Sequence, residues 1–203
     1  MRYLVGFVLA VGVVASSPGV SAQDPPASTL EPASFVAPED KALVVFVRLQ
    51  QYAFEFYVLD GNKKLLTFLR WKEHVTIEVA PGKHTFYFYI RFENACLVRA
   101  ELAAGRTYIV RTQYEGRIKP RVRAHPVLRN SADFAESAKW IREAKRGEPD
   151  FAKGNERVQK HQEAIDGEIT AAELDWLKMD EKARSSITLR PEDGRTPDEA
   201  SKL

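Results

Sequence analysis

The chain has 203 residues and a formal net charge of +2, and 44% of its residues are hydrophobic. This length is typical of one folded domain with extensions. The single cysteine, Cys96, excludes an internal disulfide, so the core must hold without covalent cross-links.

The nearly balanced charge is unevenly distributed along the chain. Residues 41–129 carry 16 basic and 7 acidic side chains, whereas residues 131–203 carry 13 basic and 17 acidic ones. Residues 23–40 add four acidic side chains and no basic one. A basic block between acidic flanks has two interpretations: the flanks fold back on the block, or the block faces an anionic partner.

Residues 1–22 have the layout of a secretory signal peptide. Arg2 supplies a positive start, residues 3–15 form an apolar run, and the sequence VSA at residues 20–22 fits a cleavage site. The run is shorter than the roughly 20 residues of a membrane span, so we expect no integral span after cleavage. No cysteine stands at the cleavage point to carry a lipid anchor. The sequence therefore predicts a periplasmic or secreted protein, and the alternative is an uncleaved N-terminal anchor.

Residues 23–40 are expected to form a proline-rich linker. Four prolines in this segment remove backbone donors and favour an extended, poorly packed chain. The linker would tether the folded part away from the point of export.

Residues 41–129 are expected to fold as an antiparallel β-sandwich of the immunoglobulin-like or transthyretin-like type. About eight short runs of alternating apolar and polar residues are separated by turn residues. The first run, residues 42–49, is apolar on both faces, which predicts a central strand. The last run contains Pro120 and Pro126, which predicts an edge strand because proline cannot donate to a β-ladder.

Cys96 is expected on the core face of one of these strands. In the run CLVRAEL at residues 96–102, alternation places Cys96 on the same face as Val98 and Leu102, whereas the charged residues point the other way. We therefore interpret Cys96 as a small buried hydrophobic residue and not as a nucleophile.

Residues 130–184 are expected to form a helical extension of two to three helices. Phe134 and Ile141 lie on one helical face of the first helix. The third helix is expected to begin at Thr170, because Thr170 and Glu173 have the spacing of a capping box.

Residues 185–203 are expected to be a disordered tail. They combine Pro191 and Pro197 with many charged and few apolar residues. Such a segment buries too little apolar surface to offset the entropy of ordering the chain.

Three sequence segments carry a resemblance to a known family. They are ALVVFVR at residues 42–48, APGKH at residues 80–84 and LAAGRTYIVR at residues 102–111. Over about residues 38–113 the chain resembles a family of exported, often lipid-anchored, bacterial envelope domains of unknown function, the one numbered twenty-eight forty-six. The resemblance implies a β-sandwich in the cell envelope and no catalytic residues.

Four cationic side chains alternate with uncharged residues near the end of the β block. Strand geometry places Arg117, Lys119, Arg121 and Arg123 on one face, about 6.6 Å apart along the strand. Like charges this close repel, so the row is a candidate site for phosphate or carboxylate groups of an envelope lipid or polymer, or for acidic residues of the C-terminal helices. The alternative is that the row protects an edge strand from aggregation. An exported chain is not expected to bind nucleic acid.

A row of tyrosines is a second candidate surface. Tyr87 and Tyr89 share one strand face, and Tyr57 lies on a neighbouring strand. The row can stack sugars, or it can be the platform on which the first expected helix packs Phe134 and Trp140.

Residues Asp166, Gly167 and Glu173 have the spacing of the second half of an EF-hand loop. The first half is missing, because Gln162 and Ala164 stand where calcium needs oxygen ligands. A weak calcium-responsive module is therefore only an alternative to the capping box at the same residues.

No motif indicates catalysis. The four histidines have no metal-ligand spacing, and the chain has no Gly-x-Ser-x-Gly elbow or phosphate-binding glycine loop. We expect no catalytic residue, metal or cofactor. The sequence thus predicts an exported, non-enzymatic binding or scaffolding protein of the bacterial periplasm or cell envelope, whose partner is an envelope protein or an anionic envelope polymer or lipid.

Overall fold

The computed structural model describes residues 34–51, 53–91, 94–116 and 121–203. The predicted signal peptide and most of the predicted linker lie outside these residues. Arg117 and Lys119 of the basic row also lie outside them.

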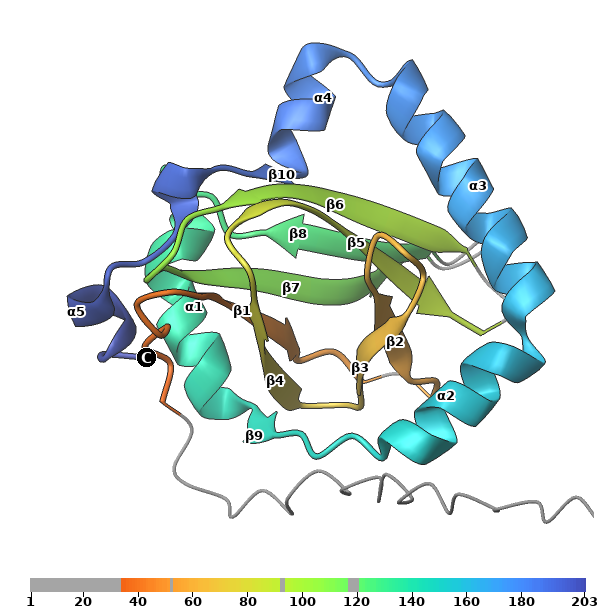
Figure 1. The fold of residues 1–203 in the computed structure, drawn as a ribbon, viewed down its shortest axis with the longest axis horizontal. Helices are drawn as coiled ribbons and strands as arrows, with labels where there is room; N and C mark the ends of the chain where they lie inside the picture. Colours follow the sequence, from red (N-terminus) through yellow and green to blue (C-terminus); the bar gives the residue numbers. More distant parts are fainter. Residues whose placement is uncertain (1–33, 52, 92–93, 117–120) are drawn as a thin grey trace, which may run out of the picture. The chain divides into compact units, whose positions relative to one another are not determined.

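Two five-stranded sheets form the centre of the fold (Figure 1). The first has the strand order β8-β7-β1-β4-β9 and the second the order β10-β6-β5-β2-β3. The strands of the first sheet are β1 (Ala42–Arg48), β4 (Glu73–Val79), β7 (Thr107–Glu115), β8 (Arg121–Pro126) and β9 (Lys145–Arg146). Those of the second are β2 (Phe56–Leu59), β3 (Leu65–Leu69), β5 (Gly82–Ile90), β6 (Ala95–Leu102) and β10 (Thr188–Leu189).

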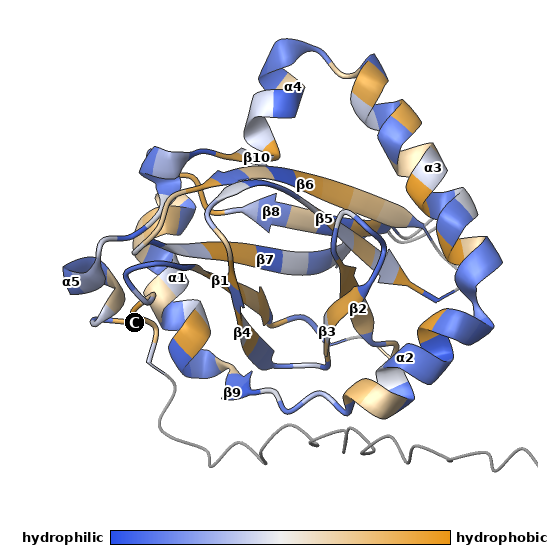
Figure 2. Cartoon of the chain, viewed as in Figure 1, coloured by the Kyte–Doolittle hydropathy of each residue, from blue (hydrophilic) through white to orange (hydrophobic). Residues whose placement is uncertain are grey.

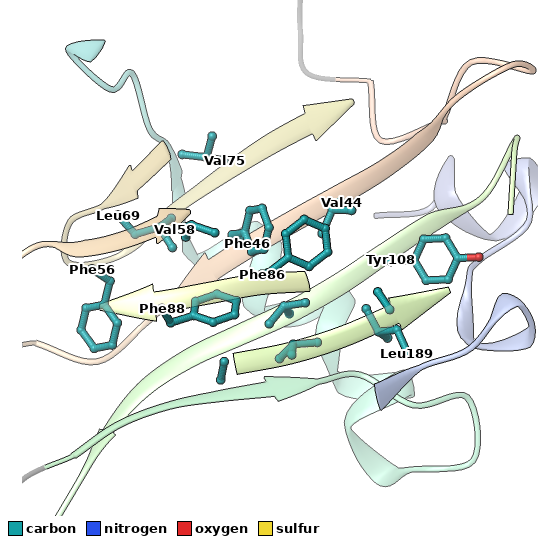
Figure 3. Close-up of a cluster of buried hydrophobic side chains, with 14 of the residues drawn as sticks. Val44, Phe46, Phe56, Val58, Leu69, Val75, Phe86, Phe88, Tyr108 and Leu189 are labelled. Atoms are coloured by element: carbon teal, nitrogen blue, oxygen red, sulfur yellow. The ribbon is translucent and has the colours of Figure 1, made fainter. Parts of the chain in front are cut away.

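The main hydrophobic core takes side chains from both sheets. Phe46 of β1 meets Phe86 and Phe88 of β5, with ring centroids 5.5 and 5.8 Å apart in edge-on arrangements (Figure 3). Such aromatic contacts add about 0.5–1.5 kcal/mol to the burial of the rings. As predicted, β1 lies in the middle of its sheet and β8 at an edge.

Helices cover the outer faces of the two sheets (Figure 1). Helix α1 (Ala132–Glu143) covers the first sheet, and α2 (Phe151–Lys160) and α3 (Gln162–Lys178) cover the second. The short helices α4 (Glu181–Ser186) and α5 (Pro197–Ala200) and a 3-10 turn at Pro191–Asp193 follow. Trp140 and Ile141 of α1 pack on Val45 and Val47 of β1, which explains why β1 is apolar on both faces. In Figure 2 the strands are largely hydrophobic, whereas α2 and α3 interleave hydrophilic and hydrophobic residues, as helices that cover a sheet do.

The sheets are not purely antiparallel, which corrects the predicted antiparallel sandwich. The pairs β1–β7, β4–β9 and β6–β10 are parallel. Parallel neighbours require long crossover connections, and no local sequence pattern specifies which distant strand returns to which edge. The broader prediction of a β-rich fold followed by helices is confirmed.

The C-terminal segment is ordered, which corrects the prediction of a disordered tail at residues 185–203. Leu189 of β10 is fully buried in the main core, and Leu189 pairs with Ala100 of β6. Arg195 and Thr107 exchange backbone hydrogen bonds of 2.8 and 3.1 Å. Few residues of this polar segment enter the core, but those few attach it to both sheets.

A further correction concerns the helix boundaries. The helix predicted to begin at Thr170 begins at Gln162 and runs without interruption to Lys178. Thr170 is therefore inside α3, where its hydroxyl donates to the carbonyl of Asp166 at 2.7 Å instead of capping a helix.

Two histidines lie near the ends of strands: His74 is buried, and His125 is partly exposed. His74 of β4 packs beside Phe35, with ring centroids 5.4 Å apart, and His125 lies on β8. Burial is the main cause that lowers the pKa of both imidazoles below the usual value of about 6.5.

We expect these histidines to make the fold acid-sensitive. Below about pH 6.5 these imidazoles bind protons in the unfolded chain but not yet in the folded protein. The free energy of unfolding therefore falls as the pH is lowered. A series of urea melts between pH 7.5 and 5 measures this slope. The variant His74→Phe, which cannot titrate, should have a shallower slope, whereas Leu177→Ala, which changes no titratable group at an exposed position of α3, should keep the wild-type slope. Equal slopes for all three proteins would contradict the prediction.

Candidate functional site

The described half of the basic row lies on an edge strand. Arg121 is exposed, and the guanidinium of Arg123 is 3.7 Å from the carboxylate of Glu115 on the neighbouring strand β7. The partner of Arg123 thus comes from the sheet itself and not from the acidic C-terminal helices. This arrangement suits the protection of an edge strand.

The tyrosine row is a packing platform, but for different helices from the one predicted. Tyr57, Tyr87 and Tyr89 are buried beneath α2 and α3, in a cluster that includes Val158 and Ile165. The predicted partner, α1, packs on the opposite sheet. Amphipathic periodicity identifies an apolar helix face but does not say which sheet it covers.

The EF-hand-like residues are engaged in ion pairs on a continuous helix. Asp166 accepts from Lys63 at 2.6 Å, and Glu173 accepts from Arg99 and from the hydroxyl of Tyr87, each at 2.5 Å. Burial, together with the hydrogen bond to Glu173, raises the pKa of Tyr87 to about 12. In this structure both carboxylates thus pair with basic side chains, and the calcium alternative stays a prediction. Within the described ranges, no group of three or more histidine, cysteine or acidic residues is placed to hold a metal ion.

Cys96 lies on the core face of β6, as predicted. It packs against the main core together with Val98, Ala100 and Leu102. Burial raises the pKa of its thiol to about 12, so the thiol stays protonated at neutral pH.

A cavity of about 650 Å³, which no sequence pattern predicted, is lined by α2, the start of α3, the ends of β1, β2 and β5, and the loops around them. We call it the α2 cavity. Its lining contains six cationic residues and two carboxylates, a formal excess of four positive charges. These are Arg48, Arg70, Arg91, Lys153, Arg157 and Lys160, with Glu55 and Glu156.

The α2 cavity combines an apolar interior with an exposed rim. Four buried residues line its interior, namely Tyr57, Tyr89, Val158 and Ile165. They also belong to the hydrophobic cluster beneath α2 and α3. Among the exposed lining residues are two large aromatic side chains, which are Phe54 and Trp71. Cavities of this size accommodate small organic ligands.

Glu55 is the centre of a hydrogen-bonded network inside the α2 cavity. It accepts from the guanidinium of Arg157 and, at 3.0 Å, from the hydroxyl of Tyr57, and Arg70 lies 3.5 Å away. Arg157 also donates to the Tyr57 hydroxyl at 3.3 Å, which raises the pKa of the guanidinium. Burial raises the pKa of Tyr57, so its hydroxyl remains a donor. This network connects α2 to β2 across the cavity.

Helix α2 places three cations along the cavity. Asp150 caps the helix by accepting from the backbone nitrogen of Lys153 at 3.0 Å. Lys153, Arg157 and Lys160 then follow at spacings of four and three residues, which is one helical face. The helix lies close to β3 because Gly154 has no side chain: a Cβ there would be 2.6 Å from Cδ2 of Leu65.

The helical spacing of these three cations is visible in the sequence and was the one available signal for the cavity. Their meeting with Arg48, Arg70 and Arg91 was not predictable, because those residues lie at the ends of three different strands, β1, β3 and β5. In the part of the chain that the structure describes, no helix is both long enough and apolar enough to cross a membrane.

In comparisons with known proteins, no protein-family model and no curated protein matches this chain.

Proposed function

We propose that this chain is an exported, non-enzymatic binding protein of the bacterial periplasm or cell envelope, and that its ligand site is the α2 cavity. The single observation that carries the proposal is the excess of four positive charges around a partly apolar cavity. The signal-like residues 1–22 support the compartment. The resemblance to envelope domains of unknown function points the same way and remains a prediction.

An anionic group is the ligand chemistry that the cations favour. Cations that share one helix face repel one another, so they lower the stability of the fold unless an anion neutralises them. Glu55 forms ion pairs with Arg157 and Arg70. Among the described residues, Lys153 and Lys160 have no carboxylate partner within ion-pair distance, so their ammonium groups remain available to a phosphate or carboxylate.

The lining suits binding better than turnover. Its most enclosed cation, Arg48, is anchored to backbone carbonyls, and Glu55 accepts from three donors, Tyr57, Arg70 and Arg157. A guanidinium stays protonated in proteins, so Arg48 can orient an anion but does not transfer a proton to it. The α2 cavity therefore replaces the edge row of Arg121 and Arg123 as the proposed anion site, because Arg123 already faces Glu115.

Phosphate binding tests this proposal. Isothermal titration at low salt with glycerol 3-phosphate should show binding to the wild-type protein. The double variant Lys153→Glu/Lys160→Glu should bind at least tenfold more weakly, because each charge-assisted bond contributes about 1.5–3 kcal/mol. The double variant Lys139→Glu/Lys178→Glu has the same net charge and changes exposed helix positions outside the cavity. Equal weakening by both double variants, or no binding by the wild type, would contradict the proposal.

A further inference from the structure

The rim of the α2 cavity exposes aromatic side chains. Trp71 is 47% exposed and Phe54 is 38% exposed, and both line the cavity. Single exposed apolar side chains are ordinary, but neighbouring ones at the mouth of a cavity mark an interaction site. Here they share the lining with Arg70, which is exposed, and with the lysines of α2.

The turn that carries Trp71 is braced in this position. Arg70 donates its backbone nitrogen to Glu73 at 2.8 Å, and Lys145 donates its own to the carbonyl of Lys72 at 2.7 Å. Lys72 has a φ of 54°, an uncommon conformation for a residue with a side chain. A turn held at both ends in a costly conformation keeps Trp71 directed away from the core.

The α2 cavity therefore combines two chemical features: the aromatic rings of Trp71 and Phe54 at its rim, and the ammonium groups of Lys153 and Lys160 in its lining. Tryptophan rings are favoured at the headgroup level of a bilayer, and clustered lysine and arginine residues are attracted to anionic lipids. A small soluble phosphate would use the cations but would not need the rings. A bilayer surface uses both.

We infer that the α2 cavity docks on the surface of an anionic phospholipid bilayer. Lys153 and Lys160 receive the phosphate of one lipid headgroup, and Trp71 and Phe54 enter the interface around it. This inference rests on the proposed function, namely that the cavity binds anions, and it adds the source of the anion and a role for the rim.

Vesicle binding tests the inference. Wild-type protein should cosediment with vesicles of phosphatidylglycerol and phosphatidylcholine in a one-to-three ratio, and not with pure phosphatidylcholine. The emission of Trp71 should shift to the blue on binding, and the variant Trp71→Phe should remove that shift, which separates it from the emission of Trp140 and Trp176. Trp71→Ala should weaken vesicle binding at least tenfold. The control Leu177→Ala, at a 61% exposed position of α3, should leave vesicle binding unchanged.

The outcomes separate the two proposals. Binding of glycerol 3-phosphate without binding to anionic vesicles would overturn the bilayer inference and leave the proposed function in place. If the wild-type protein bound neither glycerol 3-phosphate nor anionic vesicles, the proposed function and the bilayer inference would both be overturned. Vesicle binding that Trp71→Ala leaves unchanged would overturn the role of the rim. If the protein bound the acidic polysaccharide alginate but not the vesicles, the ligand would be a polysaccharide and the bilayer inference would be overturned.

Discussion

Replacing Leu189 by alanine is expected to remove about 2–5 kcal/mol from the free energy of unfolding. The side chain is fully buried in the main core, among residues of both sheets, as Figure 3 shows. Truncation would leave a cavity that the surrounding sheets cannot close. The result would be notable because Leu189 belongs to a segment whose composition suggests that it is dispensable. Urea unfolding at neutral pH measures the change.

The matched control is Leu177→Ala. Leu177 is a leucine of α3 that is 61% exposed, so its truncation should change the free energy of unfolding by no more than about 0.5 kcal/mol. A Leu189→Ala protein as stable as this control would show that the C-terminal segment is not part of the cooperative fold.

The reason for expecting a cooperative role is that several contacts attach the segment. The guanidinium of Arg129 forms two hydrogen bonds of 3.0 Å with Glu199, which hold the pKa of that carboxyl at about 2. Arg195 donates from its side chain to Ser137 of α1 at 2.7 Å. The tail thus touches α1 and both sheets, and its loss would expose surfaces on all of them.

Replacing Arg48 by methionine is expected to cost about 2–4 kcal/mol. Arg48 is fully buried, and its guanidinium donates to the carbonyls of Phe54, Leu69 and Gln50 at 2.7, 3.0 and 3.2 Å. It also lies over the ring of Phe56, 4.3 Å from the centroid. Methionine fills much of the volume but supplies no donor, so buried carbonyls would lose their partners.

The control for this variant is Arg121→Met, on the exposed edge strand β8. We expect it to change stability by no more than about 0.5 kcal/mol, because an exposed arginine exchanges its contacts with water. Chemical denaturation of the two variants measures the difference. Equal stability of both variants would show that the carbonyl contacts of Arg48 contribute nothing net.

Features that depend on neighbours in the sequence were predicted well. Alternation placed Cys96 on the core face of β6, and two-sided apolarity identified β1 as a central strand. The prolines at residues 120 and 126 identified an edge strand, and β8 lies at the edge. Each of these follows from the period of side chains along a strand or from a missing backbone donor.

The candidate site was only partly predictable. The sequence indicated that basic residues would gather around an anionic group, and it placed that group on the row of Arg117, Lys119, Arg121 and Arg123. The structure brings six other cations to the α2 cavity. Arg48, Arg70 and Arg91 come from separate strand ends, and only the packing of β2, β5 and α2 places them around one space.

The sequence by itself determined the β-rich core, the change to helical periodicity after about residue 130, the inward faces of β5 and β6 and the uneven charge. These are properties of short windows, and the geometry of a strand or helix converts them directly into faces. The tertiary structure alone decided the parallel pairing of β1 with β7, the burial of Leu189 and the α2 cavity. Those depend on which distant segments meet, and that choice is made by burial and packing over the whole chain rather than by any local pattern.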